Sequence, residues 1–206
     1  MLEVDHVIFT VRDFDVAADR IERELGLGSV QGGSHPGHGT GNRIIPLGSA
    51  YLELMAVVDE DEAVGSPLGR WVMEQARDGD QPAALCLRTD DIASLSRRLG
   101  LEPMAMSRLR PDGQELAWRL AGLTRMFDDG FPFFIEWRAD GEGYPGLMPA
   151  AHTVEVEGIS WVEIGGSAGE IDHWLGPHRL DLRVSDGSIG VVRVGIRTGA
   201  GELILE

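Results

Sequence analysis

A leucine followed by a glycine closes a short helical pattern three times, and this recurrence limits the possible folds more than any other feature. The three pairs are Leu25-Gly26, Leu99-Gly100 and Leu175-Gly176, at intervals of 74 and 76 residues. Glycine commonly ends a helix because it adopts left-handed backbone angles without a steric penalty. Solenoid repeats are shorter, roughly 20–50 residues. We therefore predict one supersecondary unit, used three times.

Each copy has the pattern of one strand, one helix and three further strands. The first copy is predicted to have strands at 4–11, 29–31, 42–47 and 51–58, with an apolar helical stripe of Val16, Ala17, Ile21 and Leu25. The second is predicted to have strands at 84–89, 104–110, 115–120 and 132–138, a helix at 92–99 and a turn at Pro111-Asp112-Gly113. The third is predicted to have strands at 159–164, 180–184, 190–197 and 202–205, and a helix at 170–175. The predicted fold class is α+β, with βαβββ units.

The same pattern gives a domain organisation. We expect a first unit at 1–60, a connecting segment at 61–81, a second unit at 82–138, a linker at 139–151 and a reduced third unit at 152–206. Ser66-Pro67 is predicted to open a helix that runs through Arg77, because proline is favoured in the first helical turn. As a hypothesis, the third unit completes its sheet across a homodimer interface.

Charge and composition exclude several functions. The 34 acidic residues outnumber the 18 basic ones, so the net charge of −16 disfavours nucleic acid and anionic membranes. The chain has no lysine, which excludes Schiff-base and P-loop lysine chemistry. This absence is typical of a GC-rich, bacterial genome. Cys86 is the lone cysteine and lies in an apolar run, so we expect a buried side chain and a reducing compartment. Without a long apolar stretch or a basic N-terminus, a cytoplasmic protein is expected.

A βαβββ unit opened by Asp5-His6-Val7 and closed by Tyr51-Leu52-Glu53-Leu54 resembles the vicinal oxygen chelate superfamily. With the glycine- and histidine-rich stretch at 33–42, it is most similar to the glyoxalase-like branch (glyoxalase, bleomycin resistance and dioxygenase type). The resemblance covers residues 2–138 well and the third unit in outline. It implies that two units form an incomplete barrel whose cleft holds a divalent metal between histidine and glutamate ligands.

Transferred residue by residue, the resemblance implies that His6, Glu53 and Glu136 bind the metal. Alignment of the first two units puts Ala84 at the place of His6, and alanine cannot be a ligand. A His-and-carboxylate set suits Zn, Ni, Mn, Fe or Mg. The alternatives are that no metal binds, that His6 caps a turn, and that both glutamates face solvent or pair with arginines, namely Arg43 and Arg119.

The stretch at 32–41 offers further candidates. His35 or His38 is expected to act as an acid or base near neutral pH, or to replace the ligand missing at Ala84. Thr40 and Asn42 are candidate substrate-binding residues at the cleft mouth. The alternative is a flexible surface loop. Elsewhere, Arg88 is a candidate partner for a substrate carboxylate, or a surface arginine.

Two functions follow as hypotheses. The first is a glyoxalase-like enzyme, an isomerase, lyase or dioxygenase, in which a divalent metal chelates substrate oxygens and stabilises an enolate-like anion. The alternative is a metal-free protein of the bleomycin-resistance type that sequesters a drug or other ligand, for which the acidity suits a cationic one. An interaction domain without a small-molecule site is a third reading. The first two expect a small-molecule partner.

Overall fold

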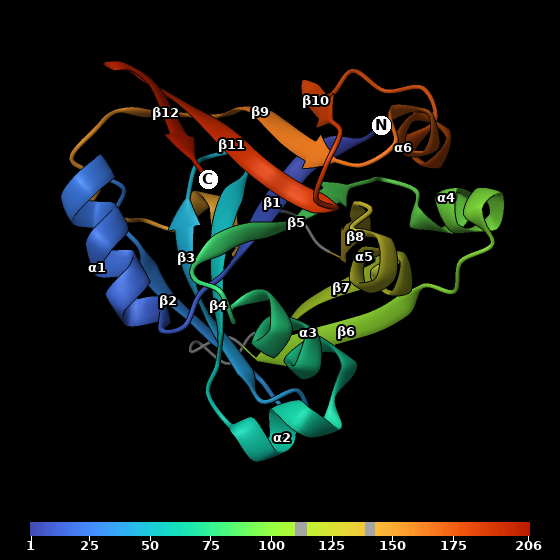
Figure 1. Ribbon diagram of the computed structural model, residues 1–206, viewed down its shortest axis with the longest axis horizontal. Coiled ribbons are helices and arrows are strands. Elements are labelled where there is room, and N and C mark those ends of the chain that lie inside the picture. Colours follow the sequence, from blue (N-terminus) through green and yellow to red (C-terminus); the bar gives the residue numbers. More distant parts are fainter. Residues whose placement is uncertain (110–114, 139–142) are drawn as a thin grey trace.

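The computed structural model describes residues 1–109, 115–138 and 143–206 (Figure 1). The first copy contains β1 (Glu3–Thr10), α1 (Phe14–Leu25), β2 (Val30–His35), β3 (Thr40–Pro46) and β4 (Tyr51–Val57), followed by α2 (Glu60–Gly65) and α3 (Pro67–Gln75). The second contains β5 (Gln81–Arg88), α4 (Ile92–Leu99), β6 (Met104–Leu109), β7 (Glu115–Ala121), α5 (Leu123–Asp129) and β8 (Phe133–Arg138). The third contains η1 (Pro145–Leu147), β9 (Val156–Gly165), α6 (Ala168–Leu175), β10 (Leu182–Ser185), β11 (Gly190–Thr198) and β12 (Gly201–Leu205).

The predicted leucine–glycine helix ends are confirmed. Helix α1 ends at Gly26 with φ 72°, and α4 ends at Gly100 with φ 66°. Their first turns are capped by Asp13 and Asp91, whose carboxylates accept hydrogen bonds from backbone N–H groups. Helix α6 ends at Gly176, also at positive φ. Short helices are therefore defined at both ends by residues that the sequence already marks.

The first two copies form one curled sheet of eight strands in the order β2-β3-β4-β1-β5-β8-β7-β6 (Figure 1). In each copy the first strand pairs in parallel with the last, β1 with β4 and β5 with β8. The two copies meet where β1 and β5 pair antiparallel. This arrangement relates the two halves by an approximate two-fold axis, and it confirms the α+β fold with a barrel-like half.

The third copy has the same order of elements but a different pairing. Its sheet is ordered β10-β9-β11-β12, so β9 lies beside the second and third strands of its set. It packs on the outer face of the eight-stranded sheet, where Val162, Ile164 and Trp174 join the core formed by that sheet and α1. The indole N–H of Trp174 donates to the carbonyl of Pro132 at 2.8 Å. The sheet of the third copy therefore buries one face against the eight-stranded sheet of the same chain.

The eight-stranded sheet separates two apolar layers. On the outer face, Val7, Phe9, Leu87 and Phe134 pack against α1 and the third set. On the concave face, the neighbouring positions along the same strands pack against side chains of α3 and α5: Ile8, Met55, Cys86, Phe133 and Ile135 meet Trp71, Val72 and Met126. Alternate residues of a strand point to opposite faces, so this division identifies which side chains face the cleft.

The structure differs from the prediction in several segments. The expected helix at 66–77 is α3, which ends at Gln75, whereas α2 before it and α5 were not predicted. Strand β2 extends into the glycine- and histidine-rich stretch as far as His35, because its backbone pairs with β3 and the side chain of Asn42 accepts from the N–H of Gly33 at 2.7 Å. Within the predicted linker, η1 forms a short turn. The turn at 111–113 and residues 139–142 lie outside the described residues.

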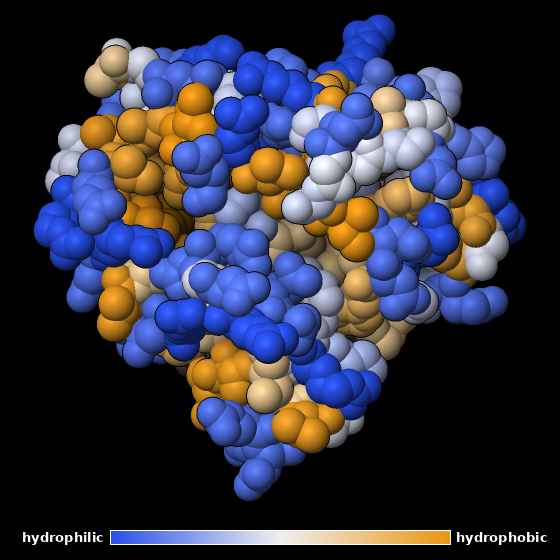
Figure 2. Space-filling model, in the orientation of Figure 1, coloured by the Kyte–Doolittle hydropathy of each residue, from blue (hydrophilic) through white to orange (hydrophobic). Residues whose placement is uncertain are grey.

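The surface matches the charge of the chain. Hydrophilic residues predominate on the face shown in Figure 2, with separate hydrophobic patches between them. Exposed large apolar side chains include Val16 and Ile204. Scattered residues of this kind are ordinary on protein surfaces. Among the described helices, none has the length and apolar character needed to cross a membrane.

Candidate functional site

A β-bulge in β1 brings two polar side chains to the same place. The register of β1 against β5 shifts between Val4 and His6, and Val4 and Val7 both pack toward the outer core. The bulge re-aims one side chain, as bulges do. Asp5 and His6 are both buried, with 0% and 4% exposure, and Oδ1 of Asp5 lies 2.8 Å from Nδ1 of His6. A carboxylate in this position favours the tautomer with its proton on Nδ1.

The other nitrogen of His6 faces Glu53. Its Nε2 lies 3.4 Å from Oε2 of Glu53, and the imidazole stacks on the ring of Tyr51. The side-chain amide of Asn42 donates to Oε1 of Glu53 at 2.5 Å. His35 approaches the same oxygen, with its Nε2 at 3.8 Å, while its Nδ1 lies 2.9 Å from the hydroxyl of Thr40. Two imidazoles therefore face one buried carboxylate.

The carboxylate of Asp5 is held from three sides. Besides His6, the indole N–H of Trp137 donates to Oδ2 at 2.9 Å, and the guanidinium of Arg88 lies 3.6 Å from the same oxygen. A fully buried carboxylate needs such partners, because leaving it unpaired costs several kcal/mol. Asp5 consequently acts as an anchor that fixes the ring of His6 from behind.

Asp5, His6 and Cys86 also offer metal-ligating atoms within 4.8 Å of one another. Burial raises the pKa of the Cys86 thiol well above its usual value, and the charges of Asp5 and Glu53 raise it further. A thiol binds metal as a thiolate, so an ion at this group would have to displace the proton of Cys86. Both oxygens of Asp5 already have partners. The opposite side of His6, toward Glu53, fits a cation better.

The ends of the first strands keep the expected counterpart of His6. After β1 the N–H of Val11 donates to the carbonyl of Met55, and after β5 the N–H of Thr89 donates to that of Ile135, both at 2.9 Å. Two residues further along, Asp13 and Asp91 cap α1 and α4. Counting back equally from these matched points puts Ala84 at the place of His6 and Phe133 at the place of Glu53.

Glu136 lies on the other face of the sheet. It neighbours Ile135, which faces the cleft, and its carboxylate accepts from the N–H of Ile92 at the start of α4 and from Arg119. Glu136 therefore pairs with Arg119, which was one of the alternatives that the sequence left open. The structure brings His6 and Glu53 together but does not bring Glu136 to them. The expected set of three ligands is not assembled.

The turn that follows β2 is packed against helices. Nδ1 of His38 lies 2.7 Å from the hydroxyl of Ser66, the capping residue of α3. Backbone N–H groups of Gly37 and Gly39 donate to the carboxylate of Glu62 in α2. His38 thus contacts a helix start, whereas His35 faces Glu53. Of the two histidines, His35 has the position from which it can exchange a proton beside the buried pair.

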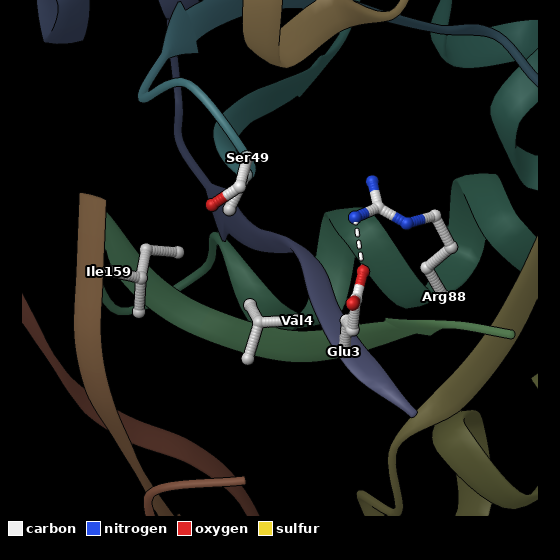
Figure 3. A pocket seen from close by; sticks show the side chains of 6 residues that line it. Glu3, Val4, Ser49, Arg88 and Ile159 are labelled. Atoms are coloured by element: carbon white, nitrogen blue, oxygen red, sulfur yellow. Dashed lines mark hydrogen bonds and ion pairs between the residues drawn. The ribbon is translucent and has the colours of Figure 1, made fainter. Parts of the chain in front are cut away.

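Arg88 lines a pocket of about 270 Å³ where the central strand β1 begins and its neighbour β5 ends (Figure 3). Its guanidinium donates to Glu3 at 2.6 Å and lies 5.1 Å from the ring centre of Tyr144. Burial lowers the pKa of Arg88, but the hydrogen bond with Glu3 and nearby charges outweigh it and raise the pKa overall. The guanidinium is therefore permanently charged at the end of β5.

Two important residues were not among the sequence candidates. Asp5 and Trp137 support His6 from behind, and only the adjacency of Asp5 to His6 was visible in the sequence. Regular strand alternation points such neighbours to opposite faces, so it gives no signal for their contact. The contact of Trp137 with Asp5 joins residues from the two halves and depends on the pairing of β1, β5 and β8.

An eight-stranded half-barrel built from two βαβββ units, with histidine and glutamate from the first and last strands on its concave face, defines the vicinal oxygen chelate class of proteins. The family model described as a glyoxalase-like domain matches residues 4–180. The chain belongs to this glyoxalase-like domain family.

Solved structures support the fold. A hypothetical protein from Staphylococcus aureus is similar over 100% of this chain and 99% of its own, with a TM-score of 0.73 and 17% identity. A methylmalonyl-CoA epimerase solved with methylmalonyl-CoA and NH4+ is similar over 68% of this chain and 96% of its own, with a TM-score of 0.50 and 16% identity. A search of curated proteins gives no match.

Proposed function

We propose that the protein is a small-molecule enzyme of the glyoxalase type whose reaction centre is the buried pair of His6 and Glu53. The observation that carries the proposal is the 3.4 Å separation between Nε2 of His6 and Oε2 of Glu53. With the Nδ1 proton directed at Asp5, Nε2 presents a lone pair to a carboxylate. Two such acceptors are stable side by side when a proton or a cation lies between them.

The donor set fits a divalent metal. Adjacent ligands of a metal with bonds of about 2.1 Å lie roughly 3.0–3.4 Å apart, close to the His6–Glu53 separation. His6 and Glu53 would hold the ion, with remaining positions open to substrate oxygens. When bound, it would polarise adjacent substrate oxygens and stabilise an enolate-like anion. Because two protein ligands bind weakly, the metal is expected to exchange with solution.

The surrounding residues supply the rest of the chemistry. Asp5 keeps the ring of His6 in place, and Asn42 fixes the carboxylate of Glu53. His35 is a quarter exposed, so its Nε2 is positioned to exchange a proton between substrate and solvent beside Glu53. Apolar neighbours such as Phe133 exclude water and strengthen charge interactions. The proposed reaction is proton transfer at a carbon next to a carbonyl.

Two measurements test this proposal. Titration of chelator-treated protein with Zn²⁺, Ni²⁺ or Mn²⁺ by calorimetry should give about one equivalent of binding. Glu53→Gln should abolish it, whereas Glu136→Gln and Cys86→Ser should retain it, because those residues are outside the proposed ligand set. Proton NMR in D₂O of 2-oxo acids should show catalysed exchange of hydrogen next to the carbonyl. Unchanged metal binding in Glu53→Gln would contradict the proposed ligands.

A metal-free ligand-binding protein is the second candidate. It is favoured by the second half of the sheet, in which Ala84 and Phe133 stand at the places equivalent to His6 and Glu53 and neither can bind a metal. In that case His6 carries the proton between Asp5 and Glu53, and the site binds without turnover. Calorimetry with cationic drugs would then give binding that a chelator does not change. Metal-dependent deuterium exchange would rule it out.

A further inference from the structure

The pocket beside Arg88 has one charged wall and one apolar wall. Arg88, Glu3 and Ser49 supply the polar groups, and Val4, Ala50 and Ile159 supply the apolar ones (Figure 3). Ile159 comes from β9, so the third set of strands contributes to the pocket. The charged and apolar walls together suit a molecule with an anionic head and a short apolar body.

The carboxylate of Glu3 occupies the position on Arg88 that the anionic group of such a molecule would take. The guanidinium of Arg88 is 27% exposed and binds Glu3, whose side chain is 58% exposed and therefore free to rotate into water. An exposed ion pair of this kind contributes little to stability, so an incoming carboxylate can replace Glu3 at little cost. The exchange leaves the number of carboxylates on Arg88 unchanged. Asp5, the other nearby carboxylate, remains paired with Trp137 and His6.

We propose that this pocket binds a small carboxylic acid in its anionic form, with Arg88 holding the carboxylate in place of Glu3 and with Val4, Ala50 and Ile159 enclosing an apolar body. A volume of about 270 Å³ has room for roughly nine groups the size of a water molecule, which limits the ligand to about that many heavy atoms. Benzoate has this size and chemistry.

The pocket is separate from the proposed reaction centre but next to it. Oδ2 of Asp5 faces Arg88, and Oδ1 faces His6, so one side chain stands between the bound acid and the imidazole. The acid site deepens the proposed function by naming a ligand class, yet it does not depend on a metal. Loss of metal binding in Glu53→Gln should leave binding of benzoate unchanged, which separates failure of one proposal from failure of the other.

Calorimetric titration with benzoate at neutral pH tests the site. Benzoate is expected to bind, and benzamide, its neutral counterpart, is not. Glu3→Gln should tighten benzoate binding about threefold or more by removing the internal competitor. Arg88→Gln should weaken it about tenfold or more, because the charge-assisted hydrogen bonds are lost. Methyl NMR signals of Val4 and Ile159 should shift on addition of benzoate.

Each test variant has a control that makes the same change of charge far from the pocket. Glu22→Gln in α1 and Arg23→Gln beside it should leave the affinity for benzoate unchanged. If Arg88→Gln unfolds the protein, Glu3→Gln alone decides, because it keeps the guanidinium in place. Equal or weaker binding of benzoate by Glu3→Gln would overturn the proposal, as would binding that is lost in Glu53→Gln or that equals the binding of benzamide.

Discussion

The carboxylate of Asp5 lies 2.8 Å from Nδ1 of His6, although the two residues are neighbours along one strand. A regular strand would direct them to opposite faces, so the contact exists because β1 bulges between Val4 and His6. The bulge gives the histidine a fixed ring orientation before any ligand arrives. It also places a buried negative charge where Trp137 and Arg88 can bind it.

Asp5→Asn should weaken this anchor. An amide keeps the shape but loses the charge-assisted hydrogen bonds, so we expect a loss of about 1–3 kcal/mol in the free energy of unfolding, measured by urea denaturation. The affinity for a divalent metal should fall about 10–100-fold. Glu3→Gln, which removes an exposed carboxylate from Arg88, is the control and should change stability by less than about 1 kcal/mol. Full metal affinity in Asp5→Asn would contradict the anchoring role.

Gly69→Ala should destabilise the contact between α3 and the turn after β2. A Cβ at Gly69 would lie 2.4 Å from the carbonyl oxygen of Ala63 and 2.6 Å from that of His38, both backbone atoms that cannot move freely. We expect a loss of more than about 1 kcal/mol on thermal or urea unfolding. Gly65→Ala is the matched control, since a Cβ there meets nothing within 4 Å. It should be neutral or stabilise slightly.

Trp174→Ala should affect the second and third copies together. Its indole packs against Phe131 and Phe134 of the second copy and donates to the carbonyl of Pro132. Removing it should cost about 3–5 kcal/mol. Hydrogen exchange should increase in β8 as well as in α6. Ile204→Ala, at a side chain that is half exposed, should have little effect. Faster exchange confined to α6 would show that the third set unfolds independently.

Cys86 should resist alkylation in the native state. Burial and the charges of Asp5 and Glu53 raise the pKa of its thiol, so the reactive thiolate is suppressed. Iodoacetamide at pH 8 should label the protein in urea but not without it. Labelling of the native protein at the rate seen in urea would show that the thiol is accessible.

The same raised pKa links stability to pH. The unfolded thiol ionises near pH 8.5, whereas the folded thiol stays protonated. The stability contributed by Cys86 is therefore present below about pH 8.5 and is lost as pH rises above it, at up to about 1.4 kcal/mol per unit. Measurement between pH 8.5 and 9.5 limits the contribution of Tyr51 and Tyr144, whose pKa values are also raised. Cys86→Ser should lack this loss.

Much of the fold was predictable because it depends on local signals. The aspartates before α1 and α4 and the glycines after them define helices within a few residues, and apolar runs identify the strands. The two-fold use of the unit follows from the recurrence of these signals. The different strand order of the third set was not predictable, since pairing depends on contacts between distant segments.

The candidate site was predictable only in part. His6 and Glu53 were identified from a resemblance, and the structure places them 3.4 Å apart. Glu136 was assigned to the cleft because it lies in a last strand like Glu53, but a shift of one residue exchanges the faces of a strand. Ile135 faces the cleft instead. The contact of Asp5 with His6 required a bulge, which no periodicity in the sequence indicates.

The pairing of His6 with Cys86 across the centre of the sheet has a broader consequence. In a two-fold symmetric sheet each position of the first half has an equivalent in the second half. In this chain the first half has polar side chains at the site, and the second half has apolar side chains that pack there. The scaffold thereby separates reactivity from rigidity within a single sheet. New donors introduced at Ala84 and Phe133, which stand at the places of His6 and Glu53, would lie on the concave face beside the existing pair. The second half of the sheet is therefore the natural place to engineer a different specificity.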